Sequence, residues 1–245
     1  MMQEVTEVHT RLLRLTLCID DSRTYWANAT PGEPLPAVQV FEESWFGHKS
    51  QDRVELLLRN LRHRFDAYPI ALEVLHKWHD MDVQTGKLIC HWHTQLGDPL
   101  YRQFAAWLAE RRLVGPSTIR RHEVIEWVEA EQPGRWAEAT QTVWARKLLG
   151  AAFEVGLVGN RRDPRTLTAP TVTNDALAYL LYLLRELNFS GSVVDNPYLS
   201  SVGLEGGLLA DRIRQLPGIS MNRLGDLVEL AFEGSSLNAW FEARQ

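Results

Sequence analysis

The sequence has few cysteines and no apolar segment long enough to cross a membrane. Only Cys18 and Cys90 occur among 245 residues, so no disulfide-stapled fold is expected and a reducing cytoplasm is the expected location. The most apolar run, Ala176 to Leu184, is far shorter than the roughly 20 residues of a membrane span. The opening MMQEVTEVHTR carries acidic residues and lacks the apolar core of a secretion signal. These features predict a soluble cytoplasmic protein without a membrane partner.

Motifs of common enzyme classes are also missing from the sequence. The chain has no Gly-x-Ser-x-Gly motif of a hydrolase. The glycine-rich GLEGG at 203–207 lacks the Lys-Ser/Thr pair of a phosphate-binding loop. The adjacent carboxylates of Asp20 and Asp21 are interpreted as helix caps rather than as a catalytic pair. We therefore expect a protein that is not an enzyme and that binds no cofactor.

The segment LICHWHTQL combines residue types that bind metal ions. On a helix, His91 and His93 point in divergent directions and cannot share one ion. Cys90 and His93 converge in part, and His76 and His79 repeat their spacing, so a four-ligand site between two helices is the metal-binding alternative. The favoured interpretation has no metal: Cys90 faces the core, and both following histidines are surface or interface groups that titrate near neutral pH.

Apolar residues recur at helical spacing through much of the chain. Ser50 is a predicted N-cap, and the helix after it has an apolar stripe, with Arg53, Arg59, Arg62 and Arg64 lying mostly outside that stripe. The stripe consists of Val54, Leu57, Leu58, Leu61 and Phe65. Gly97-Asp98-Pro99 is predicted to end one helix and to cap and begin the next. We expect a mainly α fold built as a helical bundle.

The segment from Ser117 to Val172 shows the element order of a winged helix. It reads as an extended piece at Thr118-Ile119, a helix over about 121–131, a turn, a longer helix over about 137–154, and two short extended runs around a Gly-Asn-Arg-Arg-Asp-Pro turn. In a winged helix the longer helix enters the major groove and the hairpin touches the DNA backbone or minor groove. The sequence therefore predicts a winged helix-turn-helix with a small β-hairpin.

Basic residues are concentrated in this segment, although the whole chain has a net charge of −5. Residues 111–165 contain ten Lys or Arg and seven acidic residues, a net charge of +3, which leaves −8 for the rest. Polar side chains near the start of the longer helix can reach base edges or phosphates. The candidate DNA-binding residues are Arg120, Arg121, Thr140, Gln141, Thr142, Arg146, Lys147, Arg161, Arg162 and Arg165. The alternative is a structural adaptor whose winged helix docks a partner protein.

Two segments resemble the BrxA family of bacterial BREX phage-defence systems. WFGHKSQDRVELLLRNLRHRF resembles the amino-terminal pattern of that family. RWAEATQTVWARKLLGAAFEVGLVGNRRDPRTLTAPTV resembles its W…ST…KL…L…GLL segment, and the spacing through ALAYLLYLLREL to LPGISMNRLGDLVELAF is similar. The resemblance begins at about residue 40. This chain has Ala139-Thr140 where the family carries Ser-Thr.

The resemblance implies a helical part similar to the antitermination factor NusB, joined to a winged helix. It also implies double-stranded DNA binding and a non-enzymatic accessory role beside other proteins of a defence operon. Helical domains similar to NusB bind RNA, so RNA is an alternative ligand. The expected division is an amino-terminal helical domain at 1–100, a winged-helix domain at 101–172 and a carboxy-terminal helical region at 173–245.

Overall fold

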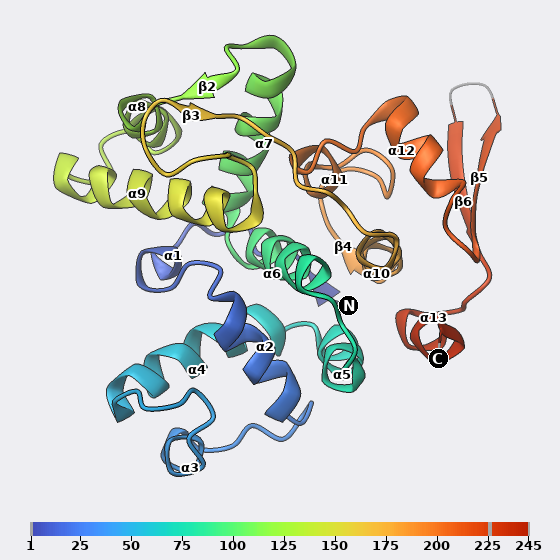
Figure 1. The fold of residues 1–245 in the computed structure, drawn as a ribbon, viewed down its shortest axis with the longest axis horizontal. Helices are drawn as coiled ribbons and strands as arrows, with labels where there is room; N and C mark the ends of the chain where they lie inside the picture. The colour runs from blue at the N-terminus through green and yellow to red at the C-terminus, as the bar shows by residue number, and fades with distance from the viewer. Residues whose placement is uncertain (1, 225–226, 245) are drawn as a thin grey trace.

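A central helix, α6 (Val83–Gly97), is surrounded by most of the other long helices in the computed structural model of this chain (Figure 1). The structure describes residues 2–224 and 227–244, which form thirteen helices and six short strands. The helices that contact α6 are α2 (Ile19–Asn28), α4 (Gln51–Phe65), α7 (Pro99–Val114), α9 (Glu138–Val155) and α10 (Asn174–Arg185). The expectation of a mainly α protein is confirmed.

The remaining elements are short and lie around this helical centre. The further helices are α1 (Arg11–Arg14), α3 (Ala37–Glu42), α5 (Pro69–Lys77), α8 (Arg121–Glu131), α11 (Pro197–Ser201), α12 (Gly206–Ile213) and α13 (Leu237–Arg244). The strands form three pairs. The first is parallel and joins β1 (Met2–Gln3) to β4 (Leu187–Asn188). The other two are antiparallel: β2 (Thr118–Ile119) pairs with β3 (Arg165–Thr166), and β5 (Ile219–Leu224) pairs with β6 (Leu227–Phe232).

Helix α4 confirms the predicted cap and apolar stripe. The Ser50 side chain accepts a hydrogen bond from the backbone N–H of Arg53, and all five apolar residues of the stripe are buried. Arg64, which lies beside the stripe, is also buried and only 6% exposed. Its guanidinium donates to the carbonyl oxygens of Leu17 and Thr16, each at 2.8 Å. These bonds satisfy a buried cation and tie α4 to the segment before α2.

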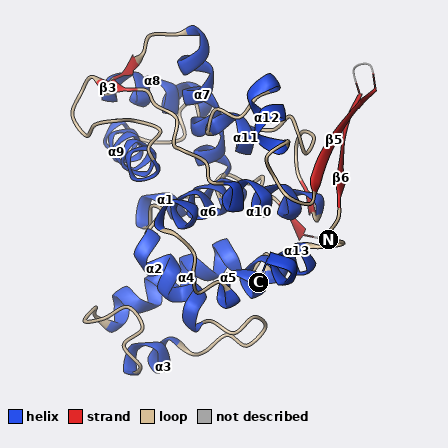
Figure 2. Ribbon diagram, turned by 45° about the vertical axis from the view of Figure 1, so that its right-hand side comes forward, coloured by secondary structure: helices blue, strands red, loops and turns tan. Residues whose placement is uncertain are grey.

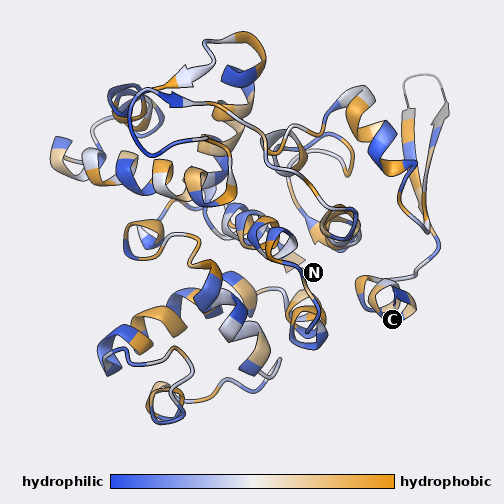
Figure 3. Cartoon of the chain, in the orientation of Figure 1, coloured by the Kyte–Doolittle hydropathy of each residue, from blue (hydrophilic) through white to orange (hydrophobic). Residues whose placement is uncertain are grey.

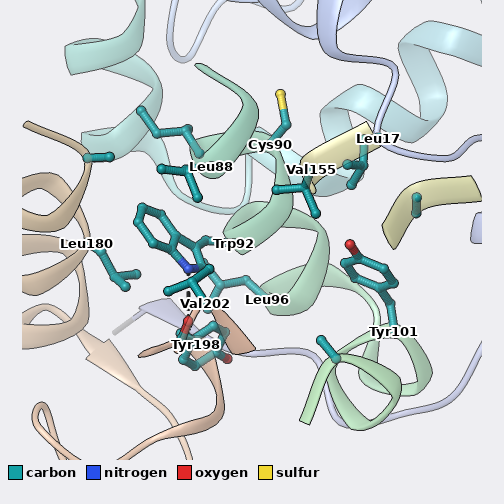
Figure 4. Packing of buried hydrophobic residues seen from close by; sticks show 14 of the residues in the cluster. Leu17, Leu88, Cys90, Trp92, Leu96, Tyr101, Val155, Leu180, Tyr198 and Val202 are labelled. Atoms are coloured by element: carbon teal, nitrogen blue, oxygen red, sulfur yellow. Dashed lines mark hydrogen bonds between the residues drawn. The ribbon is translucent and has the colours of Figure 1, made fainter. Parts of the chain in front are cut away.

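The junction between α6 and α7 also follows the sequence prediction. Helix α6 ends at Gly97, and an Asp98 carboxylate oxygen accepts from the N–H of Tyr101 at 3.0 Å, so Asp98 caps α7. Pro99 occupies the first turn of that helix. Figure 4 shows Trp92 within the core, where its indole nitrogen donates to the carbonyl oxygen of Tyr198 at 2.9 Å. Helix α6 is thus buried along most of its length.

His91 and His93 do not lie at the surface, as the sequence had suggested, but are both 0% exposed. His91 bonds to the hydroxyl groups of Tyr101 (2.8 Å) and Ser201 (3.0 Å), and His93 bonds to the Tyr179 hydroxyl at 2.7 Å. Burial lowers the pKa of each imidazole to about 3. Both rings are therefore neutral near pH 7 and act as polar members of the core.

The beginning of the chain contains the short strand β1 and two helices. Residues 11–14 form α1, and α2 follows after a short extended stretch. The expected caps are wrong: Asp20 and Asp21 lie in the first turn of α2, and Cys18 occupies the N-cap position with a left-handed backbone, φ 47°. Carboxylates in the first turn still interact favourably with the positive end of the helix dipole.

The expected carboxy-terminal helical region contains a β-hairpin, β5–β6, which is a correction to the prediction. Figure 2 shows this hairpin projecting beside α12. Ile219 is buried and Met221 partly buried, whereas Ser220 and Asn222, which alternate with them along the strand, are exposed. This alternation has the period of two residues that a half-buried strand requires. Helices α10, α11, α12 and α13 account for much of the rest of this region.

One hydrophobic cluster runs through the described part of the chain. Its members include Leu12 and Leu58 from the first predicted domain, Trp144 from the second, and Leu180 and Phe241 from the third. Hydrophilic and hydrophobic residues alternate around the outer helices, as Figure 3 shows. The three ranges therefore share a core, and their division at residues 100 and 172 stays a prediction.

Candidate nucleic-acid interface

The segment between α7 and α10 contains β2, the helices α8 and α9, and an extended stretch after α9 that lies beside β2. The carbonyl oxygen of Ser117 accepts from the N–H of Leu167, beside the β2–β3 pair. On the other side, Gly159 donates to Thr166 at 2.9 Å and Thr168 donates to Leu157 at 3.0 Å. Residues 165–168 thus lie between 117–119 and 157–159 in an antiparallel arrangement. This agrees with the extended piece and the hairpin expected from the sequence.

The apolar side of helix α9 packs into the hydrophobic core. Trp144, Leu148 and Ala152 are 0% exposed and belong to the common core. Helix α8 packs against α9, with Val124 and Val128 fully buried. The Trp144 ring also lies 5.1 Å from that of Trp136, measured between centroids. These contacts fix which side of α9 faces outward.

The outward side of α9 carries polar, basic and small residues. Thr142 and Arg146 are exposed, and Thr140 and Lys147 are partly exposed. Gly150 lies further along the same side, one and two helical turns after Arg146 and Thr142, and a β-carbon added there would meet nothing within 4 Å. A partner can therefore approach the α9 backbone closely at this glycine.

The turn after α9 is fixed by Asn160. Its side-chain amide donates to the carbonyl oxygens of Arg162 (2.6 Å) and Pro164 (3.1 Å), and its side-chain oxygen accepts from the N–H of Thr166 at 2.8 Å. The Arg161 guanidinium lies over the ring of Phe153 in α9, 4.8 Å from the centroid. Arg161 and Arg162 are both exposed. The turn thus presents two cations beside the end of α9.

Arg165 differs from the sequence prediction, because it does not lie at the tip of the turn. It belongs to β3, is 5% exposed, and its Nε atom lies 3.0 Å from a carboxylate oxygen of Asp163. Although partial burial raises the pKa of Asp163, its hydrogen bond from the Arg121 N–H and its contact with Arg165 outweigh this effect and lower that pKa overall. Arg165 is therefore a structural residue of the turn.

Gln141 is a second candidate that the structure places away from the surface. Its side chain is 8% exposed, and its amide nitrogen donates to a Glu129 carboxylate oxygen in α8 and to the Trp136 carbonyl oxygen at 3.0 Å. The side chain joins α9 to α8 and to the turn between them. It is not free to reach a base edge.

Arg120 and Arg121 lie where α8 begins. Both are exposed, and the backbone N–H of Arg120 donates to Glu123, whereas that of Arg121 donates to Asp163. Their main chains are therefore anchored while their side chains face solvent. The same start of α8 is tied to the turn after α9 through Asp163.

Six of the ten candidate residues thus form a set of cations that reach the surface, five of them exposed and Lys147 partly exposed, and Thr140 and Thr142 remain beside them. None of the six forms an ion pair with another residue that the structure describes. Gly150, Phe153 and Asn160 were missed by sequence reasoning. Only Asn160 had a usable signal, since Asn after Gly marks a turn. The six cations are Arg120, Arg121, Arg146, Lys147, Arg161 and Arg162.

The metal-binding alternative from the sequence finds no support in the geometry. The described ranges contain no group of three or more His, Cys, Asp or Glu side chains that could hold an ion. Cys90 is fully buried, and burial raises its pKa to about 12. His76 bonds instead to the carbonyl oxygen of Trp26 at 3.0 Å.

Comparisons with known proteins give no assignment. No family model matches the chain, and no curated protein matches it. Among the described residues, no helix is both long and apolar enough to cross a lipid bilayer. The geometry of the segment from Ser117 to Thr168 is therefore the main guide to function.

Proposed function

We propose that this protein is a non-catalytic double-stranded DNA-binding protein that acts through a winged helix at residues 101–172. The observation that carries the proposal is the set of six surface cations, five exposed and Lys147 partly exposed, on the start of α8, the outer side of α9 and the turn after it. Basic side chains of this kind neutralise phosphates and release counterions, which drives DNA binding.

The order and pairing of the elements support the winged-helix proposal. Helices α7, α8 and α9 are followed by an antiparallel turn, and β2 pairs with the returning strand β3. In such folds the last helix lies in the major groove and the wing contacts the backbone. Here α9 is the recognition helix and residues 159–164 are the wing.

The exposed residues divide into two roles on this proposal. Thr142 and Arg146 face outward from α9 and would reach base edges or phosphates in the groove. Arg161 and Arg162 on the wing would contact phosphates. Arg120 and Arg121 would supply flanking phosphate contacts from the start of α8.

The resemblance to the BrxA family extends this proposal to a biological role. We propose a cytoplasmic accessory protein of a BREX-type anti-phage system, with double-stranded DNA and other proteins of the same operon as partners. The helical part on which the winged helix rests is the portion that would correspond to NusB.

A protein-docking adaptor is the second candidate function. The observation that favours it is a pair of exposed apolar side chains at the end of α7: Leu113 is 67% and Val114 is 90% exposed. They lie shortly before β2 in the sequence. An exposed apolar pair of this kind is a common part of a protein contact.

The test compares the affinity of wild type and Arg161→Gln/Arg162→Gln for a labelled DNA duplex, with an RNA duplex in parallel. The control Arg59→Gln/Arg214→Gln removes the same charge from exposed positions on α4 and after α12. We expect the wing variant to lose at least about tenfold in DNA affinity while the control binds nearly as wild type. If the wing variant and the control bind the DNA duplex with equal affinity, DNA binding through the wing is contradicted. If the wild type binds the RNA duplex more tightly than the DNA duplex, RNA is the ligand instead.

A further inference from the structure

Two histidines from distant parts of the chain converge on one backbone carbonyl outside the candidate interface. The Nε2 atoms of His9 and His63 lie 3.2 Å apart. The carbonyl oxygen of Gly97 is 2.8 Å from Nε2 of His9 and 3.4 Å from Nε2 of His63. The three groups come from the amino-terminal segment, from α4 and from the end of α6. Three potential ligand atoms thus surround one point.

The arrangement of the two rings matches that around a tetrahedral ion. With Zn–N bonds of about 2.0–2.1 Å, two imidazole nitrogens on one tetrahedral ion are about 3.3 Å apart, and their ring centroids are about 5 Å apart. The centroids of His9 and His63 are 5.0 Å apart, with the ring planes at 75°. A straight N–H···N hydrogen bond at the observed separation would place the centroids about 5.5 Å apart, farther than they are.

The carboxylate of Asp98 lies close to the His9 ring. Asp98 is 5% exposed, and its Oδ2 atom has no hydrogen-bond partner among the described residues. That oxygen lies 3.6 Å from Nδ1 of His9, the ring nitrogen that also accepts a hydrogen bond from the backbone N–H of Arg11 at 3.4 Å. A carboxylate at the second nitrogen orients a histidine and increases its strength as a metal ligand.

The same residues line a small cavity. Its volume is about 20 Å³, enough for one water-sized occupant, and its lining includes His9, His63, Gly97 and Asp98. Arg11 and Arg64 also line it. Their positive charges oppose a cation, so the affinity must come from the nitrogen ligands and be weaker than that of a four-residue structural zinc site.

We propose that His9, His63 and the Gly97 carbonyl bind one divalent transition-metal ion of the zinc class, with Asp98 positioning His9. The remaining coordination position takes a water molecule. Imidazole ligands suit Zn²⁺, whereas Mg²⁺ and Ca²⁺ prefer oxygen ligands, so the site discriminates against the latter two.

The ion would fasten the amino-terminal segment to the helical centre and, through it, to the α8–α9 unit. Val8, next to His9, accepts a hydrogen bond through its carbonyl oxygen from Arg135 in the α8–α9 connection, at 2.8 Å. Val5 donates from its backbone to Leu96 at 2.8 Å. Metal binding at His9 therefore stabilises a segment that reaches both parts of the protein.

The test is equilibrium dialysis of the chelator-treated full chain against Zn²⁺, with Mg²⁺ and Ca²⁺ in parallel. We expect one Zn²⁺ per chain and no Mg²⁺ or Ca²⁺. His9→Gln and His63→Gln should each weaken binding by at least tenfold, whereas the control His122→Gln, at an exposed histidine of α8, should not. Asp98→Asn keeps an oxygen to cap α7 but loses the charge beside His9, and should weaken binding by about 10–100-fold.

Cobalt binding to the wild-type chain gives a second readout that does not depend on a variant's folding. Co²⁺ in the site should produce the strong visible absorption of four-coordinate cobalt, displaced by one equivalent of Zn²⁺. The proposal is overturned if wild type retains no Zn²⁺, if the His9 variant binds as wild type, or if Co²⁺ gives only the weak spectrum of the hydrated ion. DNA binding through α9 is measured separately and does not depend on these outcomes.

Discussion

The guanidinium group of Arg161 lies over the ring of Phe153, 4.8 Å from its centroid. This contact joins the turn after α9 to the last turns of α9 itself. Both residues belong to the outward side of the α8–α9 unit, and Arg161 is exposed. The contact therefore holds one cation of the turn at a defined place beside the helix, so that the two elements present a single basic surface.

Phe153→Leu should loosen the turn while keeping an apolar side chain in place. We expect the free energy of unfolding to fall by about 0.5–1 kcal/mol, the usual strength of a partly exposed cation–π contact. Urea denaturation of Phe153→Leu, Arg161→Ala and the double variant measures this coupling. If the two substitutions are simply additive, the contact contributes nothing to stability.

Replacing Arg165 and replacing Arg162 by alanine should have different effects on stability and on DNA binding. Arg165→Ala removes a buried side chain that packs within β3 and pairs with Asp163, so we expect a loss of about 1–3 kcal/mol in unfolding free energy. Arg162→Ala removes an exposed charge and should change stability by less than about 0.5 kcal/mol, but it should weaken DNA binding more than expected from stability. Equal destabilisation by both variants contradicts the structural role assigned to Arg165.

Tyr179→Phe tests the buried histidine of α6. The substitution keeps the ring and leaves Nε2 of His93 without the hydroxyl that now lies 2.7 Å away. An unpaired buried polar group costs about 1–3 kcal/mol, and we expect the midpoint of urea unfolding to shift accordingly. A variant as stable as wild type shows that this hydrogen bond is dispensable.

Stability should fall as the pH drops below about 6.5, because of His91 and His93. The folded pKa of each ring is lowered to about 3 by burial, whereas an unfolded histidine titrates near 6.5. Below 6.5 the unfolded chain therefore binds more protons, so the contribution present above 6.5 is lost progressively towards pH 3. Each ring contributes up to about 1.4 kcal/mol per pH unit. Urea unfolding between pH 7 and 4.5 should give a flatter profile for His91→Gln/His93→Gln; identical profiles contradict the burial effect.

The elements between Thr118 and Val155 could be predicted almost residue by residue from the sequence. Their apolar periodicity and Pro-Gly turn agree with one another, and β2, α8 and α9 lie within a residue of their expected bounds. The burial of Gln141 and Arg165 could not be predicted, because it depends on Glu129 and Asp163 as partners. Polar and basic residue types do not reveal such pairings.

The carboxy-terminal hairpin shows where periodicity is ambiguous. In LVELAF, apolar residues at Leu227, Leu230 and Ala231 fit a helix, whereas Val228, Leu230 and Phe232 fit a strand. The pattern of a short apolar run does not decide between helix and strand, because the outcome depends on the element against which the run packs. Likewise, the burial of His91 and His93 depends on surrounding helices that the segment LICHWHTQL does not specify.

The most direct test of DNA binding through α9 is a fluorescence anisotropy titration of a labelled duplex with Gly150→Glu and Gly150→Lys. Both side chains extend from an open position, and both favour a helix more than glycine does, so they differ mainly in charge. We predict that the Glu variant binds at least about tenfold more weakly than wild type, with the Lys variant binding as tightly or more tightly, and that the difference shrinks as salt is raised. Equal affinities of the two variants at low salt would contradict a DNA-binding face on α9.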